Sequence, residues 1–207
     1  MSTTPTKLNI MNAALRKVGS YFLDESDTTS TTYQITNQAY LDAILEIFSE
    51  NRFSYNTTRV ELSAVNVNPI TNRPYENYFE LPSNFNTLYY LEHPTQHYKI
   101  SDYVIEQGTL FANEDSVNLY YTFVPDLEEY AESIPPFLNR VIVLHIAQAL
   151  SIELSGSENR HEILFQQYML ALRRARVVDG RQGPSQSLMD DSTSTILGTH
   201  RTYGTIQ

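Results

Sequence analysis

Four stretches of the chain carry apolar residues at the three- and four-residue spacing of an amphipathic helix. The first covers residues 6–18, and Gly19 follows it at the position where a glycine often ends a helix. The second covers about residues 33–50, where two rows of apolar side chains lie side by side on one face. We therefore expect two helices in the N-terminal part of the chain.

The other two helical stretches predict a helical hairpin near the C-terminal end. Pro135 and Pro136 suit a first helical turn, because a proline needs no N–H partner there. The run 141–147 (VIVLHIA) is apolar almost all round, which is typical of a helix buried on most sides. Residues 155–157 (SGS) predict the corner, and the second arm extends to about Asp179. Its expected packing stripe consists of Leu164, Tyr168, Ala171, Ala175 and Val178.

Between the two pairs of helices the pattern changes to the two-residue period of strands. Val60, Leu62 and Ala64 alternate with polar residues, and Gln107-Gly108 predicts a tight hairpin turn. Further short strands are expected at residues 78–81, 89–92, 98–100, 103–106, 109–111 and 117–123.

This order of elements predicts the α+β class, with a four-helix bundle as the core, an inserted small antiparallel β lobe and an extended C-terminal tail. The N-terminal helices occupy residues 1–58 and the β lobe residues 59–124. The hairpin that completes the bundle occupies residues 125–180, and the tail residues 181–207. The tail is rich in Ser, Thr, Gly and Asp, so its apolar content is too low to offset the entropy of ordering it alone.

Composition excludes several classes of protein. The formal net charge of −10 argues against a protein that grips nucleic acid backbones, and the absence of cysteine excludes disulfides and thiolate metal sites. No apolar run approaches the roughly 20 residues that cross a bilayer, and the N-terminus lacks the apolar segment of a secretory signal.

The charge is unevenly distributed. Residues 173–207 hold five of the 14 lysines and arginines but three of the 24 aspartates and glutamates. The five cations are Arg173, Arg174, Arg176, Arg181 and Arg201. They either complement the dipole at the end of the last helix or bind an acidic surface on a partner.

The chain has 15 tyrosines and no tryptophan. Tyrosine joins a large apolar ring to a polar tip, which suits both strands and protein interfaces. For any single tyrosine we favour the strand interpretation.

Candidate catalytic groups are few. Glu128, Glu129 and Glu132 form the densest carboxylate cluster, but they lie in a polar connection that would not raise the pKa of an acid. His93 and His97 have the spacing of a helical metal pair, yet Pro94 predicts a turn there. His145 is expected to be a core histidine with one hydrogen-bond partner. We expect no catalytic residue, no cofactor and no metal.

The order of several short motifs resembles the tail tubular protein A family of short-tailed bacteriophages, the head-to-tail adaptors or gatekeeper-ring proteins. The similar segments are residues 12–19 (NAALRKVG), 51–55 (NRFSY), 81–85 (LPSNF), 103–111 (YVIEQGTLF) and the C-terminal hairpin. The family often has a tryptophan after the second helix, where Phe53 or Tyr55 stands here.

The resemblance implies a structural virion protein that is not an enzyme. It implies a dodecameric ring between the portal protein and the tail nozzle protein, with tail fibres as a further candidate partner. The genome would pass through this ring without specific binding, and no membrane is involved. The protein would be made in the host cytoplasm and reside at the head–tail interface of the virion.

The tail supplies the expected portal-docking residues. Apolar and basic side chains recur in it without helical spacing, so they would act as separate anchors along an extended peptide. These residues are Arg181, Leu188, Ile196, Leu197, Arg201 and Tyr203.

Two other functions remain open at this point. The tyrosine-rich sheet would bind a host glycan or a tail fibre by aromatic stacking, without any ring. Alternatively, Glu128, Glu129 or Glu132 would serve a muralytic glycosidase.

Overall fold

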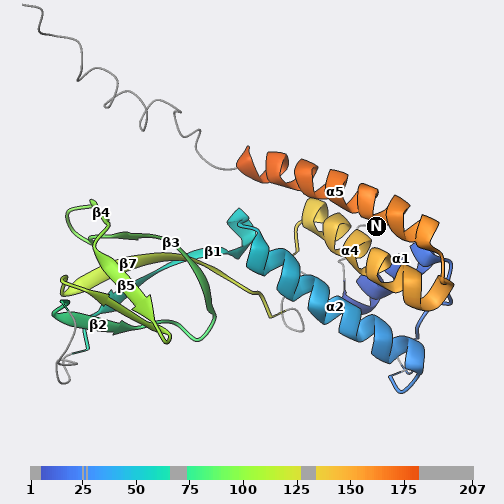
Figure 1. Cartoon of the computed structure of the whole chain (residues 1–207), viewed down its shortest axis with the longest axis horizontal. Helices are drawn as coiled ribbons and strands as arrows, with labels where there is room; N and C mark the ends of the chain where they lie inside the picture. Colours follow the sequence, from blue (N-terminus) through green and yellow to red (C-terminus); the bar gives the residue numbers. More distant parts are fainter. Residues whose placement is uncertain (1–5, 25, 27, 66–73, 127–133, 182–207) are drawn as a thin grey trace, which may run out of the picture.

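The computed structural model describes residues 6–24, 26, 28–65, 74–126 and 134–181. Within these residues the chain forms four α-helices, one short 3-10 helix and seven strands (Figure 1). The helices are α1 (Lys7–Val18), α2 (Thr31–Glu50), α4 (Pro136–Ser155) and α5 (Glu158–Gly180), with η1 (Ser54–Asn56) after α2. The strands are β1 (Thr57–Ser63), β2 (Asn77–Glu80), β3 (Phe85–Glu92), β4 (Lys99–Ile100), β5 (Tyr103–Glu106), β6 (Thr109–Ala112) and β7 (Ser116–Phe123).

Local capping groups explain where the helices begin and end. The side chain of Ser30 accepts a hydrogen bond from the Tyr33 N–H and so begins α2 two residues earlier than we expected. Gly19 and Gly156 end α1 and α4 in the left-handed conformation, with φ of 82° and 58°. Both glycines therefore have the roles that the sequence predicts.

Helix α4 forms the centre of the helical part. It packs against α1, α2 and α5, and it lies between α2 and α5 in the view of Figure 1. Its fully buried side chains are Leu138, Val141, Ile142, Leu144, Ile146, Ala147 and Leu150.

By length and composition α4 is able to cross a membrane, so the expectation that no apolar segment approaches that length is wrong. More than half of this helix is buried inside the protein, as in the core helix of a bundle.

The strands form two antiparallel sheets. The first has the order β1-β7-β3-β4, and the second has the order β2-β6-β5. The hairpin between β5 and β6 turns at Gln107 and Gly108, which both have positive φ, as the sequence predicts. In contrast, β1 pairs with β7 along its whole length, although Thr57 and its partner Thr122 are far apart in the sequence.

The sheets enclose a hydrophobic core of their own. Phe79, Leu91, Leu110 and Leu119 are fully buried there, and they belong to four different strands from both sheets. The protein is therefore of the α+β class, but the predicted architecture of one four-helix core with a small β lobe is wrong. The alternating apolar residues of the strands face each other between two sheets instead of covering the bundle, so the molecule has two cores.

The C-terminal end of α5 is tied to the junction between the two cores. The Asp179 carboxylate accepts hydrogen bonds from the backbone N–H and the hydroxyl of Ser54. Arg176 donates to the side chain of Asn51, which ends α2. Because η1 leads directly into β1, these bonds join α5 to the start of the first sheet.

Candidate interaction surfaces

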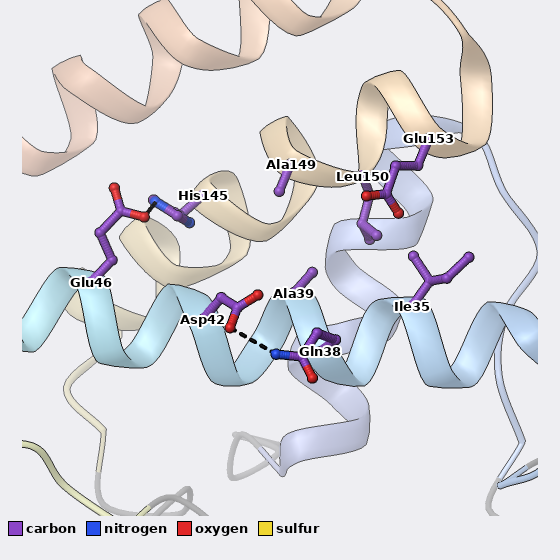
Figure 2. A pocket seen from close by; sticks show the side chains of 9 residues that line it. All are labelled: Ile35, Gln38, Ala39, Asp42, Glu46, His145, Ala149, Leu150 and Glu153. Atoms are coloured by element: carbon purple, nitrogen blue, oxygen red, sulfur yellow. Dashed lines mark hydrogen bonds and ion pairs between the residues drawn. The ribbon is translucent and has the colours of Figure 1, made fainter.

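An acidic groove of about 460 Å³ runs between α2 and α4 (Figure 2). Asp42 and Glu46 reach it from α2, and Glu153 reaches it from α4. Gln38 donates a hydrogen bond to Asp42 over 2.8 Å. The remaining lining residues are Ile35, Ala39, His145, Ala149 and Leu150. An open groove with three carboxylates and an apolar floor suits a cationic side chain better than a metabolite.

His145 lies at the back of this groove. The residue is 7% exposed, and its Nε2 is 3.2 Å from Glu46 Oε2. The ring stands edge-on to Tyr168, with the ring centroids 4.9 Å apart. This confirms the expected core histidine with one polar partner. Its buried Nδ1 has no hydrogen-bond partner among the residues that the structure describes.

The buried Tyr168 side chain should make the free energy of unfolding depend on pH in the alkaline range. Burial raises the pKa of Tyr168 from 10.0 to about 12, and the charges of Glu46 and Glu50 add to the shift. Between pH 10 and 12 the Tyr168 phenol therefore keeps its proton in the folded protein but loses it in the unfolded chain. Tyr168 alone should therefore lower the free energy of unfolding as pH rises from 10 to 12, by at most about 1.4 kcal/mol per pH unit.

Urea unfolding at a series of pH values measures this fall. Tyr168→Phe should remove the part that this phenol causes and leave the part caused by the other tyrosines whose pKa is raised, such as Tyr90 and Tyr121. An identical pH dependence in both proteins would contradict the assignment.

Helix α5 carries two apolar rows, and one of them is exposed. Leu164, Tyr168, Ala171 and Ala175 are buried against the core, as predicted, whereas Val178 is 37% exposed and does not belong to that stripe. The second row repeats every seven residues. It consists of Ile163, Leu170 and Val177, which are 50%, 49% and 55% exposed.

Polar and basic residues continue this second row. Gln167, Arg174 and Arg181 each follow one of its apolar residues by four positions, so all six lie on one side of the helix. We call these six residues the α5 stripe. The seven-residue repeat is present in the sequence, but we expected only the buried row.

The structure separates the roles of the C-terminal arginines. Arg176 is used internally, in its bond to Asn51. The last turn of α5 contains no basic residue, so the helix dipole does not explain Arg173 and Arg174. Within the described part of the chain, Arg173, Arg174 and Arg181 make no side-chain hydrogen bond or ion pair. These three cations are exposed and available to a partner.

Helix α2 carries an exposed face of the opposite charge. Leu41 and Leu45 are 45% and 58% exposed. Asp42 and Glu46 follow these leucines directly in the sequence and border the acidic groove. With Gln38, these residues form what we call the α2 face. Exposed leucines beside two carboxylates favour packing against a helix that is apolar and basic.

The outer face of the first sheet is lined by tyrosines that already have partners. Tyr90 stacks on Tyr120, with centroids 4.1 Å apart, and the Arg59 guanidinium donates to the Tyr120 hydroxyl. Arg52 lies 3.7 Å from the ring centroid of Tyr89. Tyr89 and Tyr90 belong to β3 and Tyr120 belongs to β7, which confirms the strand interpretation for these three tyrosines.

The two histidines of the predicted turn bind carboxylates. His97 Nδ1 is 2.6 Å from Glu92 Oε1, and this hydrogen bond lowers the pKa of Glu92. His93 Nε2 is 4.0 Å from Glu114 Oε2. Among the described residues, no group of three or more histidine or acidic side chains is placed to hold a metal ion.

Most of the expected portal-docking residues lie outside the described residues. Of the six, the structure places only Arg181, which follows the end of α5. Outside it are the other five, Leu188, Ile196, Leu197, Arg201 and Tyr203, and the candidate glycosidase carboxylates Glu128, Glu129 and Glu132.

The comparisons with known proteins add no family: the chain matches no protein-family model and no curated protein.

Proposed function

We propose that this protein is a structural head-to-tail adaptor of a short-tailed bacteriophage, which forms a ring between the portal protein and the tail nozzle protein. The proposal comes from the motif order that resembles the tail tubular protein A family. The observation that supports it most directly is the presence of two unlike exposed helical faces on one subunit. The α5 stripe is apolar and basic, and the α2 face is apolar and acidic.

Two unlike faces favour a ring over a symmetric dimer. A two-fold dimer uses the same patch on both subunits, whereas a ring joins one patch to a different patch on the next subunit. Helices α2 and α5 lie on opposite sides of α4 in Figure 1, which is how such patches are arranged in a head-to-tail assembly. With a net charge of −10, the assembled channel would repel DNA and let it slide.

The net charge of −10 on each subunit leads to a prediction about when the ring assembles. Acidic subunits repel one another, so we expect monomers or mixed oligomers at low concentration and a closed ring only on the portal. Mass photometry of the protein, with and without the purified portal protein of the same phage, measures this directly. Electron micrographs of the mixture should show a ring coaxial with the portal.

The rival functions predict different results in the same experiment. A glycan- or fibre-binding module would stay monomeric with the portal and would still bind its ligand. A tight dimer in both conditions would contradict the adaptor function. For the glycosidase, Glu→Gln changes at positions 128, 129 and 132 would have to abolish a measured muralytic activity.

A further inference from the structure

The α5 stripe has the residue pattern of a helix–helix seam. Ile163, Leu170 and Val177 recur every seven residues, and polar or basic residues follow each of them by four. Positions separated in this way form the contact line of two packed helices in coiled coils. The buried side of α5 is already complete, so the stripe is a second seam that the single subunit leaves exposed.

The charges of the stripe define its partner. Its arginines require a surface with carboxylates, and its apolar residues require exposed aliphatic side chains beside them. The α2 face supplies both, with Leu41 and Leu45 next to Asp42 and Glu46. No second chain type is needed, because the two surfaces are parts of the same subunit.

The two surfaces also have similar lengths. The stripe extends from Ile163 to Arg181, which corresponds to about 27 Å of helix. The exposed side of α2 extends from Gln34 to Ser49, or about 22 Å. Both are long enough for four or more turns of helix to pack side by side.

We infer that the α5 stripe of one subunit packs against the α2 face of the next copy of this chain. Arg174 and Arg181 lie against the carboxylates that border the acidic groove, and the aliphatic residues of both helices form the centre of the contact. This inference rests on the proposed ring and names the surfaces that build it.

The absence of cysteine makes cross-linking a direct test. A chain that carries Leu45→Cys on α2 and Leu170→Cys on α5 is oxidised on the portal and separated on a denaturing gel. Head-to-tail packing should yield a ladder of covalent multimers that extends beyond the dimer. A mixture of the two single variants should yield dimers and nothing larger, because each subunit then has one reactive position.

A matched control lies on the same helix. Phe165 is 37% exposed but faces away from the stripe, so Phe165→Cys combined with Leu45→Cys should give no ladder.

A second measurement reverses the charges of the proposed contact. Arg174→Glu should abolish the ladder of the double-cysteine chain, and adding Asp42→Lys should restore it.

The outcomes separate the contact from the proposed function. If wild-type rings form on the portal but the ladder is absent, the contact is wrong and the adaptor function stands. If Leu170→Cys alone forms a covalent dimer, α5 packs on itself and the inference is overturned. Products of the double variant that stop at the dimer would likewise overturn it, since they indicate a two-fold assembly.

Discussion

Replacing Leu144 by Ala is expected to lower the free energy of unfolding by about 2–5 kcal/mol. Leu144 is 1% exposed and lies on α4, the helix that packs against all the others of the helical core. The change removes buried methyl groups and leaves a cavity that the surrounding helices cannot fill without shifting. Urea unfolding followed by circular dichroism measures the difference.

Leu170→Ala is the matched control for this prediction. It deletes the same atoms from a helix but at a half-exposed position, where stability should change by no more than about 0.5 kcal/mol. Similar midpoints for Leu144→Ala, Leu170→Ala and the wild type would mean that α4 is not the centre of the core.

Deleting the C-terminal segment after Arg181 is expected to abolish attachment to the portal while leaving the melting temperature nearly unchanged. The structure suggests this cut, because the Arg181 N–H donates to the Val178 carbonyl and so completes the end of α5. Most of the deleted residues are polar, so their loss should not affect the core. The few apolar ones among them suit an extended peptide that binds a partner groove.

Phage assembly gives the readout for this deletion. Heads should fill with DNA and lack tails, because the adaptor no longer docks. Replacing Leu188, Ile196, Leu197 and Tyr203 by Ser in the full-length chain should reproduce the defect, whereas replacing nearby serines by Ala should not. Infectious particles that contain the truncated protein would refute the docking role of the segment.

The sequence by itself determined the local elements. Ser157 and Gly156 carry enough local information to place the corner between α4 and α5, because a cap bonds to atoms within one helical turn. The same holds for the hairpin at Gln107 and Gly108, where left-handed φ values are needed at adjacent residues. Such features depend on neighbours in the chain, so one sequence is sufficient to find them.

Only the tertiary structure decided how the elements combine. The alternation in β1 shows that one side is apolar, but it does not say that β7 is its neighbour or that a second sheet covers that side. Pairing between distant strands depends on many contacts at once, and the period of two is the same for one sheet or two. For this reason the separate core of the β part was missed.

The candidate interface shows the same limit. The sequence contains both rows of α5, with Leu164 in one and Ile163 in the other, and each row has helical spacing. Which row is buried depends on the shape of α4 beside it, because burial is a property of packing and not of spacing. The exposed row with its arginines, and the acidic α2 face, became distinct surfaces only when the helices were in place.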